Sequence, residues 1–191
     1  QGLAVAAQTQ HHALLYDTGP DFSGDADSGN RILIPTLRAL GIAKLDGLIL
    51  THDDIDHTGG AASVMQAMPI DWVSSSLPKE HPLLVNLNNA KRCQAGELWQ
   101  WDGVNFEILN PDAASYADKK MRDNNRSCVL RISVGEQHIL LTADIEKEVE
   151  KQLLAEHADK LSTTLLVAPH HGSKTSSTDE FIAAALPDYA V

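Results

Sequence analysis

The sequence has 191 residues, of which 43% are hydrophobic and 21% are charged, a composition typical of one globular domain with a substantial core. It contains no apolar run of about 18 residues, and this excludes a membrane-spanning helix within the sequence. The formal net charge of −11 excludes a general electrostatic attraction of the whole surface to nucleic acid phosphates.

The first half of the chain predicts a hairpin followed by alternating helices and strands. Short apolar runs bounded by turn residues predict strands, and apolar residues at helical spacing predict helices. Gly41 and Pro69 mark the ends of two of these helices. The expected strands are Gly2–Gln8, His12–Asp17, Leu45–Leu50 and Ile70–Val73, the helices Arg31–Leu40, Gly60–Met68 and Leu83–Ala90, and the loops Pro20–Gly29 and Thr51–Thr58.

The second half predicts two further hairpins and then two helices on either side of a strand. Asp102-Gly103 and Gly135-Glu136 are turn sequences between apolar runs. Ile145, Val149 and Leu153 fall on one face of a predicted helix. The expected strands are Glu97–Trp101, Asn105–Leu109, Cys128–Val134, His138–Leu141 and Thr164–Ala168, the helices Ile145–His157 and Asp179–Leu186, and the loops Asn110–Arg126 and Pro169–Thr178.

This order of elements predicts an α/β fold in which two sheets lie between helices. In such folds, sites form from loops at the ends of strands, so we expect chemistry in the polar loops that follow apolar strands. The chain starts within a predicted strand, Gln1–Gln8, and stops where another begins, Tyr189–Val191. We therefore expect residues 1–191 to form a single domain that is a fragment of a longer polypeptide.

The two cysteines, Cys93 and Cys128, lie far apart in the sequence. Two thiolates are too few for a zinc cluster built from cysteine alone. Two alternatives stay open: a disulfide in an oxidising compartment, or two buried free thiols.

The loop Thr51–Gly60 follows an apolar strand and contains two histidines and three aspartates. Adjacent carboxylates repel each other in a solvated turn, and bound divalent cations remove that repulsion. Imidazole and carboxylate together suit Zn²⁺, Mn²⁺ or iron. The spacing allows His52 and Asp54 to point at one ion, and Asp56 and His57 to reach a second. The alternative is a charged surface loop.

Two more strand ends are candidates for the same site. The pair His170-His171 follows one strand, although adjacent histidines alone are a weak signal, as the pair His11-His12 illustrates. Asp144 follows another strand and precedes a helix. Its alternative role is a helix N-cap, a common position for aspartate.

Taken together, these residues resemble the motifs of the metallo-β-lactamase superfamily. The run from His52 to His57 resembles the family's HxHxDH signature, with Asp54 in place of the second histidine. Asp17-Thr18-Gly19 resembles the first motif, whose aspartate supports the metal loop and does not bind metal. The resemblance implies a sandwich of two mixed sheets between helices (αββα) and a metal-dependent hydrolase. The implied metal ligands are His52, Asp54, Asp56, His57, Asp144 and His170.

One departure from the family pattern points to a particular subgroup of the family. Many members supply another histidine from a middle strand, but no histidine lies between His81 and His138. Asn124-Asn125-Arg126-Ser127 precedes a strand there instead. With the segments QGLAV, LLYDTGP and HHGSKTSS, this pattern resembles the C-terminal domain of bacterial competence DNA-uptake channels of the ComEC type.

The missing histidine leaves His52, Asp54 and Asp144, with a water, for the first metal site. A set of three imidazoles and three carboxylates favours two Mn²⁺ ions, with Zn²⁺ as the alternative. The ions would activate a water, and Asp54 is the candidate to accept its proton. We favour His170 as the last ligand because it ends its strand more directly. His171 would then contact substrate or act as an acid, and the reverse order stays open.

The resemblance also implies that the substrate is DNA and that the domain degrades the strand that is not imported. Basic and hydroxyl side chains flank the predicted site and would contact phosphates on an otherwise acidic protein. The candidate substrate-binding residues are Asn125, Arg126, Ser127, Ser173 and Lys174. The implied partners are single-stranded DNA and the remaining channel domains of the same membrane protein, with no nucleotide cofactor. The implied location is the outer face of the bacterial cytoplasmic membrane.

Two other functions fit the same residues. The first is a hydrolase of this fold that acts on a lactone, a thioester or a small phosphodiester. The second is a non-catalytic assembly module of the channel. The absence of a histidine from the middle strands favours this hypothesis.

Overall fold

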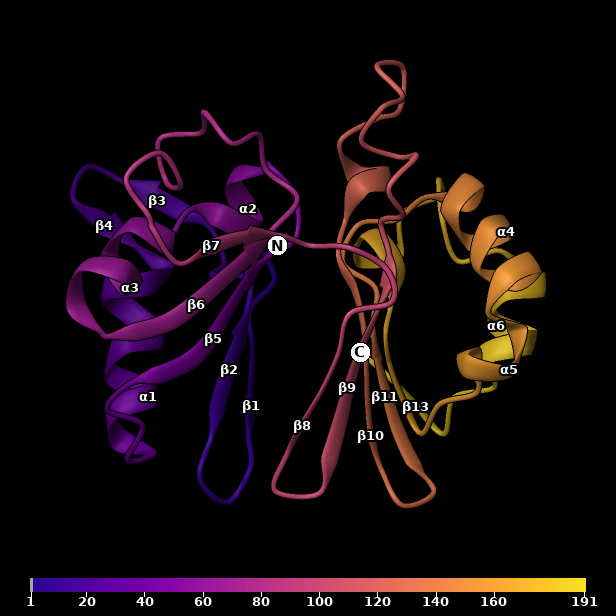
Figure 1. Cartoon of the computed structure of the whole chain (residues 1–191), viewed down its shortest axis with the longest axis horizontal. Helices are drawn as coiled ribbons and strands as arrows, with labels where there is room; N and C mark the ends of the chain where they lie inside the picture. The colour runs from indigo at the N-terminus through magenta and orange to yellow at the C-terminus, as the bar shows by residue number, and fades with distance from the viewer. Residues whose placement is uncertain (1) are drawn as a thin grey trace. The chain divides into compact units, whose positions relative to one another are not determined.

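The computed structural model describes residues 2–191, so Gln1, where we placed the start of the first strand, lies outside the described residues. The chain divides into two compact units, Gln1–Arg92 (unit 1) and Cys93–Val191 (unit 2). Each unit has its own sheet, helices and core (Figure 1). Among residues 2–191, the structure has no helix that could span a bilayer.

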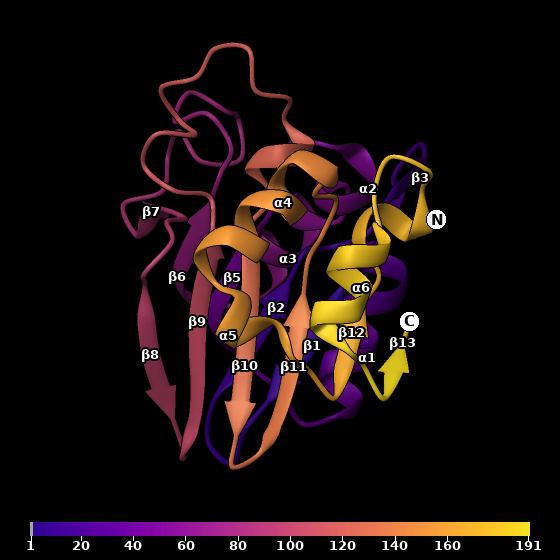
Figure 2. The same ribbon diagram turned by 90° about the vertical axis from the view of Figure 1, so that its right-hand side faces the viewer.

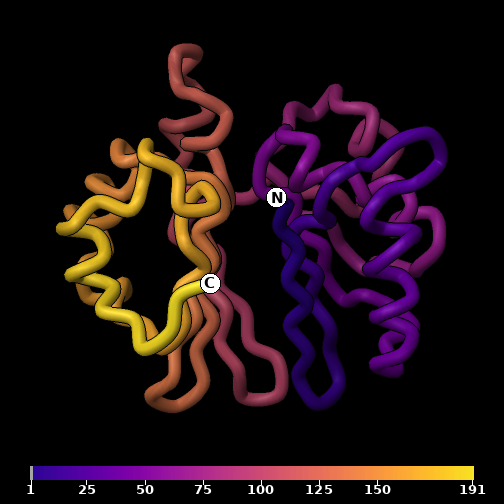
Figure 3. Tube along the Cα trace, turned by 180° about the vertical axis from the view of Figure 1, so that it is seen from behind, coloured from indigo at the N-terminus to yellow at the C-terminus, as the bar shows by residue number. Residues whose placement is uncertain are grey.

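Unit 1 is built on a five-stranded mixed sheet in the order β1-β2-β5-β6-β7. Strands β1 and β2 form an antiparallel hairpin at one edge, visible in indigo in Figure 3, and every other neighbouring pair is parallel. The strands are β1 (Val5–Gln8), β2 (Ala13–Tyr16), β5 (Leu45–Leu50), β6 (Ile70–Ser75) and β7 (Ala90–Arg92). A separate small hairpin pairs β3 (Asp21–Ser23) with β4 (Ala26–Asp27).

Helices cover one face of this sheet (Figure 1). A π-helical turn, η1 (Gly29–Leu33), leads into α1 (Ile34–Ala39), and the shorter α2 (Ile55–Thr58) precedes α3 (Ala61–Ala67). Every residue of β5 is buried, as expected of a central strand in a parallel sheet. Its leucines form one core cluster with Leu37 of α1 and Val64 of α3.

Unit 2 is built on a six-stranded mixed sheet in the order β13-β12-β11-β10-β9-β8. The pairs from β8 to β11 are antiparallel, and β11, β12 and β13 are parallel. Figure 2 shows α4, α5 and α6 in front of this sheet. The strands are β8 (Leu98–Trp101), β9 (Val104–Asn110), β10 (Val129–Val134), β11 (Gln137–Leu141), β12 (Leu165–Val167) and β13 (Tyr189–Ala190); the helices are η2 (Asn124–Arg126), α4 (Lys147–Glu156), α5 (Ala158–Leu161), η3 (Pro169–Gly172) and α6 (Asp179–Ala185).

The core of unit 2 forms where these helices meet the sheet. The predicted apolar face of Ile145, Val149 and Leu153 is buried, and it packs in one cluster with Leu166 of β12 and Phe181 of α6. The sequence prediction of an α/β fold with two mixed sheets is therefore confirmed.

Cys93 and Cys128 are joined by a disulfide within unit 2, with their Cα atoms 6.2 Å apart. Both residues are fully buried. Of the two alternatives left open by the sequence, the structure therefore shows the paired cysteines.

The helix predicted over Leu83–Ala90 is wrong, because this segment forms consecutive turns. Its leucines pack against the core of unit 1 without helical geometry. The side chain of Asn89 donates hydrogen bonds to the carbonyls of Ile70 (2.9 Å) and Asp71 (3.1 Å). These bonds bring Ala90 into register with Val73, so the segment ends by adding β7 to the sheet.

Four other segments differ from the prediction. The predicted loop Pro20–Gly29 contains the β3–β4 hairpin, and the predicted loop Thr51–Thr58 contains α2. Strand β6 continues to Ser75 because its two serines pair with strands on both sides and are buried despite their polarity. The helix predicted over Ile145–His157 begins at Lys147, after Ile145 has already entered the core.

Candidate functional site

The polar loop after β5 brings two histidines together inside unit 1. His52 follows the strand and His57 lies in α2, and both side chains are fully buried. Their ring centroids are 4.2 Å apart. A Cβ on Gly59 would overlap the backbone of Asp21, so the glycine after α2 allows the loop to pack against its neighbour. The loop therefore presents two buried imidazoles at the carboxyl end of a central strand.

Asp17 holds this loop in place from the end of β2. Its backbone is left-handed, with φ 58°, a region that aspartate tolerates better than most residues. One carboxylate oxygen accepts a hydrogen bond from the backbone N–H of Thr51 (2.8 Å), and the other lies 2.8 Å from both Thr51 Oγ1 and His57 Nδ1. Because Asp17 is fully buried, these contacts compensate the cost of its desolvation.

Each of the two histidines is oriented through Nδ1. His57 Nδ1 contacts Asp17, and His52 Nδ1 lies 2.9 Å from Thr51 Oγ1. Histidines that bind metal through Nε2 are usually held in this way, by a hydrogen bond at the other ring nitrogen. The two side chains therefore fit a metal-binding role in which Nε2 is the ligand atom.

The aspartates of the loop differ in their surroundings. Asp54 Oδ2 lies 3.4 Å from His52 Nε2, and the Asp54 side chain is about half exposed at 49%. Asp56 is partly buried in the first turn of α2. Asp53 was not among the predicted ligands. Its Oδ1 atom lies 3.0 Å from Nε2 of His81.

Unit 2 gathers the other predicted ligands. Asp144 is 3% exposed, and its two carboxylate oxygens face the histidine pair. His170 Nε2 lies 3.7 Å from Oδ2, and His171 Nε2 lies 3.6 Å from Oδ1. The N-cap of the following helix α4 is Glu146, so the alternative role of Asp144 as that cap is wrong.

The histidine loop of unit 2 has an unusual backbone. His170 and His171 have φ values of 49° and 52°, and Gly172 follows at 75°. Each non-glycine residue in this left-handed region costs about 1–3 kcal/mol, and such strain is concentrated at functional sites. The backbone N–H of His170 donates to the Ala143 carbonyl (2.9 Å), and Nδ1 lies 2.9 Å from Thr175 Oγ1. His170 thus has the same Nδ1 support as His52 and His57.

Glu150 anchors this loop, a role that we did not predict for it. Its fully buried carboxylate accepts hydrogen bonds from the backbone N–H groups of Ser177 (2.5 Å) and Thr178 (2.9 Å) and from Thr178 Oγ1 (2.7 Å). The side chain lies on the buried face of α4. A buried acidic residue on a predicted apolar helix face was the available signal.

The three residues predicted to bind substrate before β10 make internal hydrogen bonds. Asn125 Oδ1 accepts from the backbone N–H of Glu146 (2.9 Å), and Ser127 Oγ accepts from that of Asp144 (3.3 Å). The Arg126 guanidinium donates to two backbone carbonyls of its own loop. Asn125 and Ser127 thus support the segment that carries Asp144, and Arg126 supports its own loop. Contact of these residues with substrate stays a prediction.

A cavity of about 580 Å³ in unit 2 is lined in part by Lys174, the other basic residue predicted to bind substrate. Lys174 lies exposed in the histidine loop, and Ser173 next to it accepts a hydrogen bond from Thr175 Oγ1 (3.2 Å). Arg122 donates two hydrogen bonds to the buried carboxylate of Glu146 (2.9 and 3.1 Å), so its charge is balanced locally. The cavity is lined by Asp118, Lys120, Met121, Arg122, Asn125, Glu146, Lys147, Glu148, Lys174 and Thr175.

Known proteins with similar sequences include bacterial competence proteins. The chain is 38% identical over 191 residues to competence protein ComA of Neisseria gonorrhoeae, covering all of this chain and 25% of that protein. It is 33% identical over 211 aligned residues to ComE operon protein 3 of Bacillus subtilis, covering 98% of this chain and 26% of that protein. The chain therefore spans about a quarter of the length of these relatives.

The fold and the family profile agree with this similarity. The metallo-beta-lactamase fold protein YhfI from Bacillus subtilis superposes with a TM-score of 0.56 at 16% identity, covering 86% of this chain and 62% of that one. The sequence profile of the metallo-beta-lactamase superfamily matches residues 1–117, more than half of the chain. This chain belongs to the metallo-beta-lactamase superfamily.

Proposed function

We propose that this chain is a metal-dependent phosphodiesterase domain that cleaves DNA during natural transformation and degrades the strand that is not imported. The observation that favours this proposal most is that three histidines each have a hydrogen-bonding oxygen next to Nδ1. His52, His57 and His170 each have Nδ1 within 2.9 Å of a hydroxyl or carboxylate oxygen, which leaves Nε2 as the ring nitrogen suited to a metal.

The proposed ligand set combines these three imidazoles with three carboxylates. Such a mixture of nitrogen and oxygen donors suits two divalent ions, with Mn²⁺ favoured over Zn²⁺. When bound, the ions would supply Lewis-acid activation of water and of a phosphate oxygen. The proposed ligands are His52, Asp54, Asp56, His57, Asp144 and His170.

The side chains of this protein would handle the protons and orient the ligands. The Asp54 side chain is about half exposed, whereas that of Asp144 is almost fully buried, so Asp54 is placed to accept a proton from the attacking water. His171 is the proposed acid for the leaving oxygen, with its Nε2 3.6 Å from Asp144. Asp17 would orient His57 and would not bind metal itself.

DNA as substrate is supported by a relative whose name refers to competence, the competence protein ComA. Asn125, Arg126, Ser127, Ser173 and Lys174 are the proposed substrate-binding residues. We propose single-stranded DNA and the remaining domains of a longer membrane channel as partners, and the outer face of the cytoplasmic membrane as the location.

The test is cleavage of labelled single- and double-stranded DNA with and without Mn²⁺. We expect Mn²⁺-dependent cleavage that an Asp54→Ala/Asp56→Ala variant loses. Asp25→Ala is the matched control, because Asp25 is an exposed aspartate of the same unit outside the proposed ligands. Cleavage that persists in the double variant would contradict the proposal.

A non-catalytic assembly module is the second candidate, favoured by the absence of histidine between His81 and His138. It predicts neither cleavage nor stoichiometric metal binding. Stoichiometric metal that is lost in Asp56→Ala, without DNA cleavage, would instead favour a hydrolase of another substrate, such as a lactone, a thioester or a small phosphodiester.

A further inference from the structure

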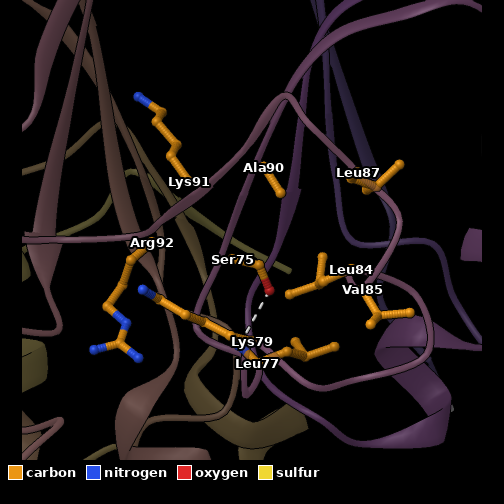
Figure 4. A pocket seen from close by; sticks show the side chains of 9 residues that line it. All are labelled: Ser75, Leu77, Lys79, Leu84, Val85, Leu87, Ala90, Lys91 and Arg92. Atoms are coloured by element: carbon orange, nitrogen blue, oxygen red, sulfur yellow. Dashed lines mark hydrogen bonds between the residues drawn. The ribbon is translucent and has the colours of Figure 1, made fainter.

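Unit 1 has a pocket at the carboxyl ends of β6 and β7 that the proposed metal site does not use (Figure 4). Its volume is about 290 Å³, at the lower end of the range for small-molecule sites. Ser75 ends β6 and pairs in register with Arg92, which ends β7. The carboxyl edge of parallel strands is where ligands bind in α/β sheets, so the position itself is suited to a site.

The pocket is tied to the loop that carries His52. Ser75 Oγ donates to the Leu50 carbonyl (3.0 Å), and Ser76 Oγ donates to the Thr51 carbonyl. Further along the same segment, His81 pairs with Asp53. A group bound in the pocket would therefore lie beside the predicted metal loop within the same unit.

The charged residues lining this pocket are all cationic: Lys79, Lys91 and Arg92. This is unusual for a chain with a net charge of −11. Lys91 has its ammonium 4.9 Å from the ring centroid of Trp72 and points away from the other two cations in Figure 4. Lys79 and Arg92 are the other two cations that line the pocket, and Figure 4 shows their charged ends on the same side of it.

The opposite wall is apolar. Figure 4 shows Leu84, Val85 and Leu87 on the side of the pocket away from Lys79 and Arg92. Val85 is 60% exposed, and Leu84 belongs to the core that supports this wall. The pocket thus offers two cations to one end of a ligand and a hydrocarbon surface to the other. A nucleotide has this polarity, with a phosphate at one end and an apolar base face at the other.

We propose that this pocket binds one nucleotide of a DNA strand next to the cleavage site, with its phosphate on Lys79 and Arg92 and its base against Val85 and Leu87. The identity of the strand as DNA rests on the proposed function. Binding by the pocket needs no metal, so binding and cleavage are measured separately.

The experiment measures binding of a fluorescent single-stranded oligodeoxynucleotide to the 191-residue chain by anisotropy, in EDTA, over a series of salt concentrations. We expect a Lys79→Gln/Arg92→Gln variant to bind more weakly, with a salt slope smaller by about 0.7, the contribution of one neutralised phosphate of a single strand. The control is Arg31→Gln/Arg38→Gln, which removes the same charge from exposed positions on the helices of unit 1.

A second arm tests the apolar wall with an abasic oligonucleotide of the same length. We expect the wild-type chain to bind the normal strand more tightly than the abasic one, and Val85→Asp to reduce this difference. Val85 is exposed, so this change leaves the core intact, which circular dichroism checks for every variant.

Each outcome bears on the pocket alone. No binding by the wild-type chain, or equal salt slopes for the pocket and control variants, would overturn the pocket proposal even if Mn²⁺-dependent cleavage occurs. Equal binding of normal and abasic strands would overturn the base contact. Absence of cleavage together with the expected binding pattern would leave the pocket standing and reject the nuclease.

Discussion

The Nδ1 atom of His57 lies 2.8 Å from the Oδ2 atom of Asp17, a residue 40 positions earlier in the chain, and both side chains are fully buried. This contact joins the end of β2 to helix α2. It fixes the orientation of the imidazole before any ligand binds. Substitution of Asp17 therefore tests whether the proposed metal site depends on the orientation of His57.

Asp17→Asn should lower the affinity for Mn²⁺ by about 10- to 100-fold, the usual cost of removing the residue that orients a metal-binding histidine. Asparagine tolerates the left-handed backbone at this position. Its amide can donate to Nδ1, which would favour the tautomer with a proton on Nε2. Isothermal titration with Mn²⁺ measures the change, with Asp25→Asn as control, and unchanged affinity in Asp17→Asn would contradict the role.

Thr175→Val should weaken metal binding through His170, because it removes the oxygen 2.9 Å from Nδ1. Thr175 is exposed, so water can partly replace the hydroxyl, and we expect a loss of about tenfold, at the low end of the usual range. Thr175→Ser keeps the hydroxyl and should restore the affinity. If His171 is the ligand instead, His171→Ala should abolish binding while Thr175→Val has no effect.

Glu150→Gln should lower the free energy of unfolding by about 1–3 kcal/mol, since the amide leaves one of the buried donors of Ser177 and Thr178 unsatisfied. Urea denaturation measures this. Glu156→Gln makes the same substitution at an exposed position of α4 and should have almost no effect. Equal stabilities of the two variants would show that Glu150 does not anchor the histidine loop.

Reduction of the bond between Cys93 and Cys128 should lower the free energy of unfolding by about 3–4 kcal/mol, as expected for a loop of 35 residues. Urea denaturation with and without reductant gives this difference. A Cys93→Ser/Cys128→Ser variant should not respond to reductant. Alkylation of the unreduced, denatured chain should label no thiol, and two labelled thiols would contradict the disulfide.

His138 should make the chain less stable at mildly acidic pH. Burial, and then the charge of Arg131, lower the pKa of His138 below its ordinary value of 6.5. Below about pH 6.5 the unfolded chain therefore takes up a proton before the folded chain does, and the free energy of unfolding falls as the pH falls through this range. His138→Gln should show a smaller fall between about pH 7 and pH 5.5 in urea denaturation. An identical fall would contradict the prediction.

Features that depend on neighbouring residues could be predicted from the sequence. The apolar run Leu45–Leu50 predicted the central strand β5, and the turn sequence Asp102-Gly103 predicted the hairpin of β8 and β9. The spacing of His52 and His57 placed both in the segment after β5, although His57 lies in helix α2 and not in a loop. These predictions held because strand burial, turn geometry and motif spacing are set by local sequence.

Features that depend on partners distant in the sequence could not be predicted and became visible in the folded chain. The contact of Glu150 with Ser177 and the disulfide join segments separated by intervening elements, and the pairing of β7 with β6 joins two strands separated by a long run of turns. The turns over Leu83–Ala90 replaced the predicted helix for the same reason. The side chain of Asn89 donates hydrogen bonds to the first two residues of β6, and the leucines pack on the core of unit 1. These interactions outweighed a weak local preference for helix.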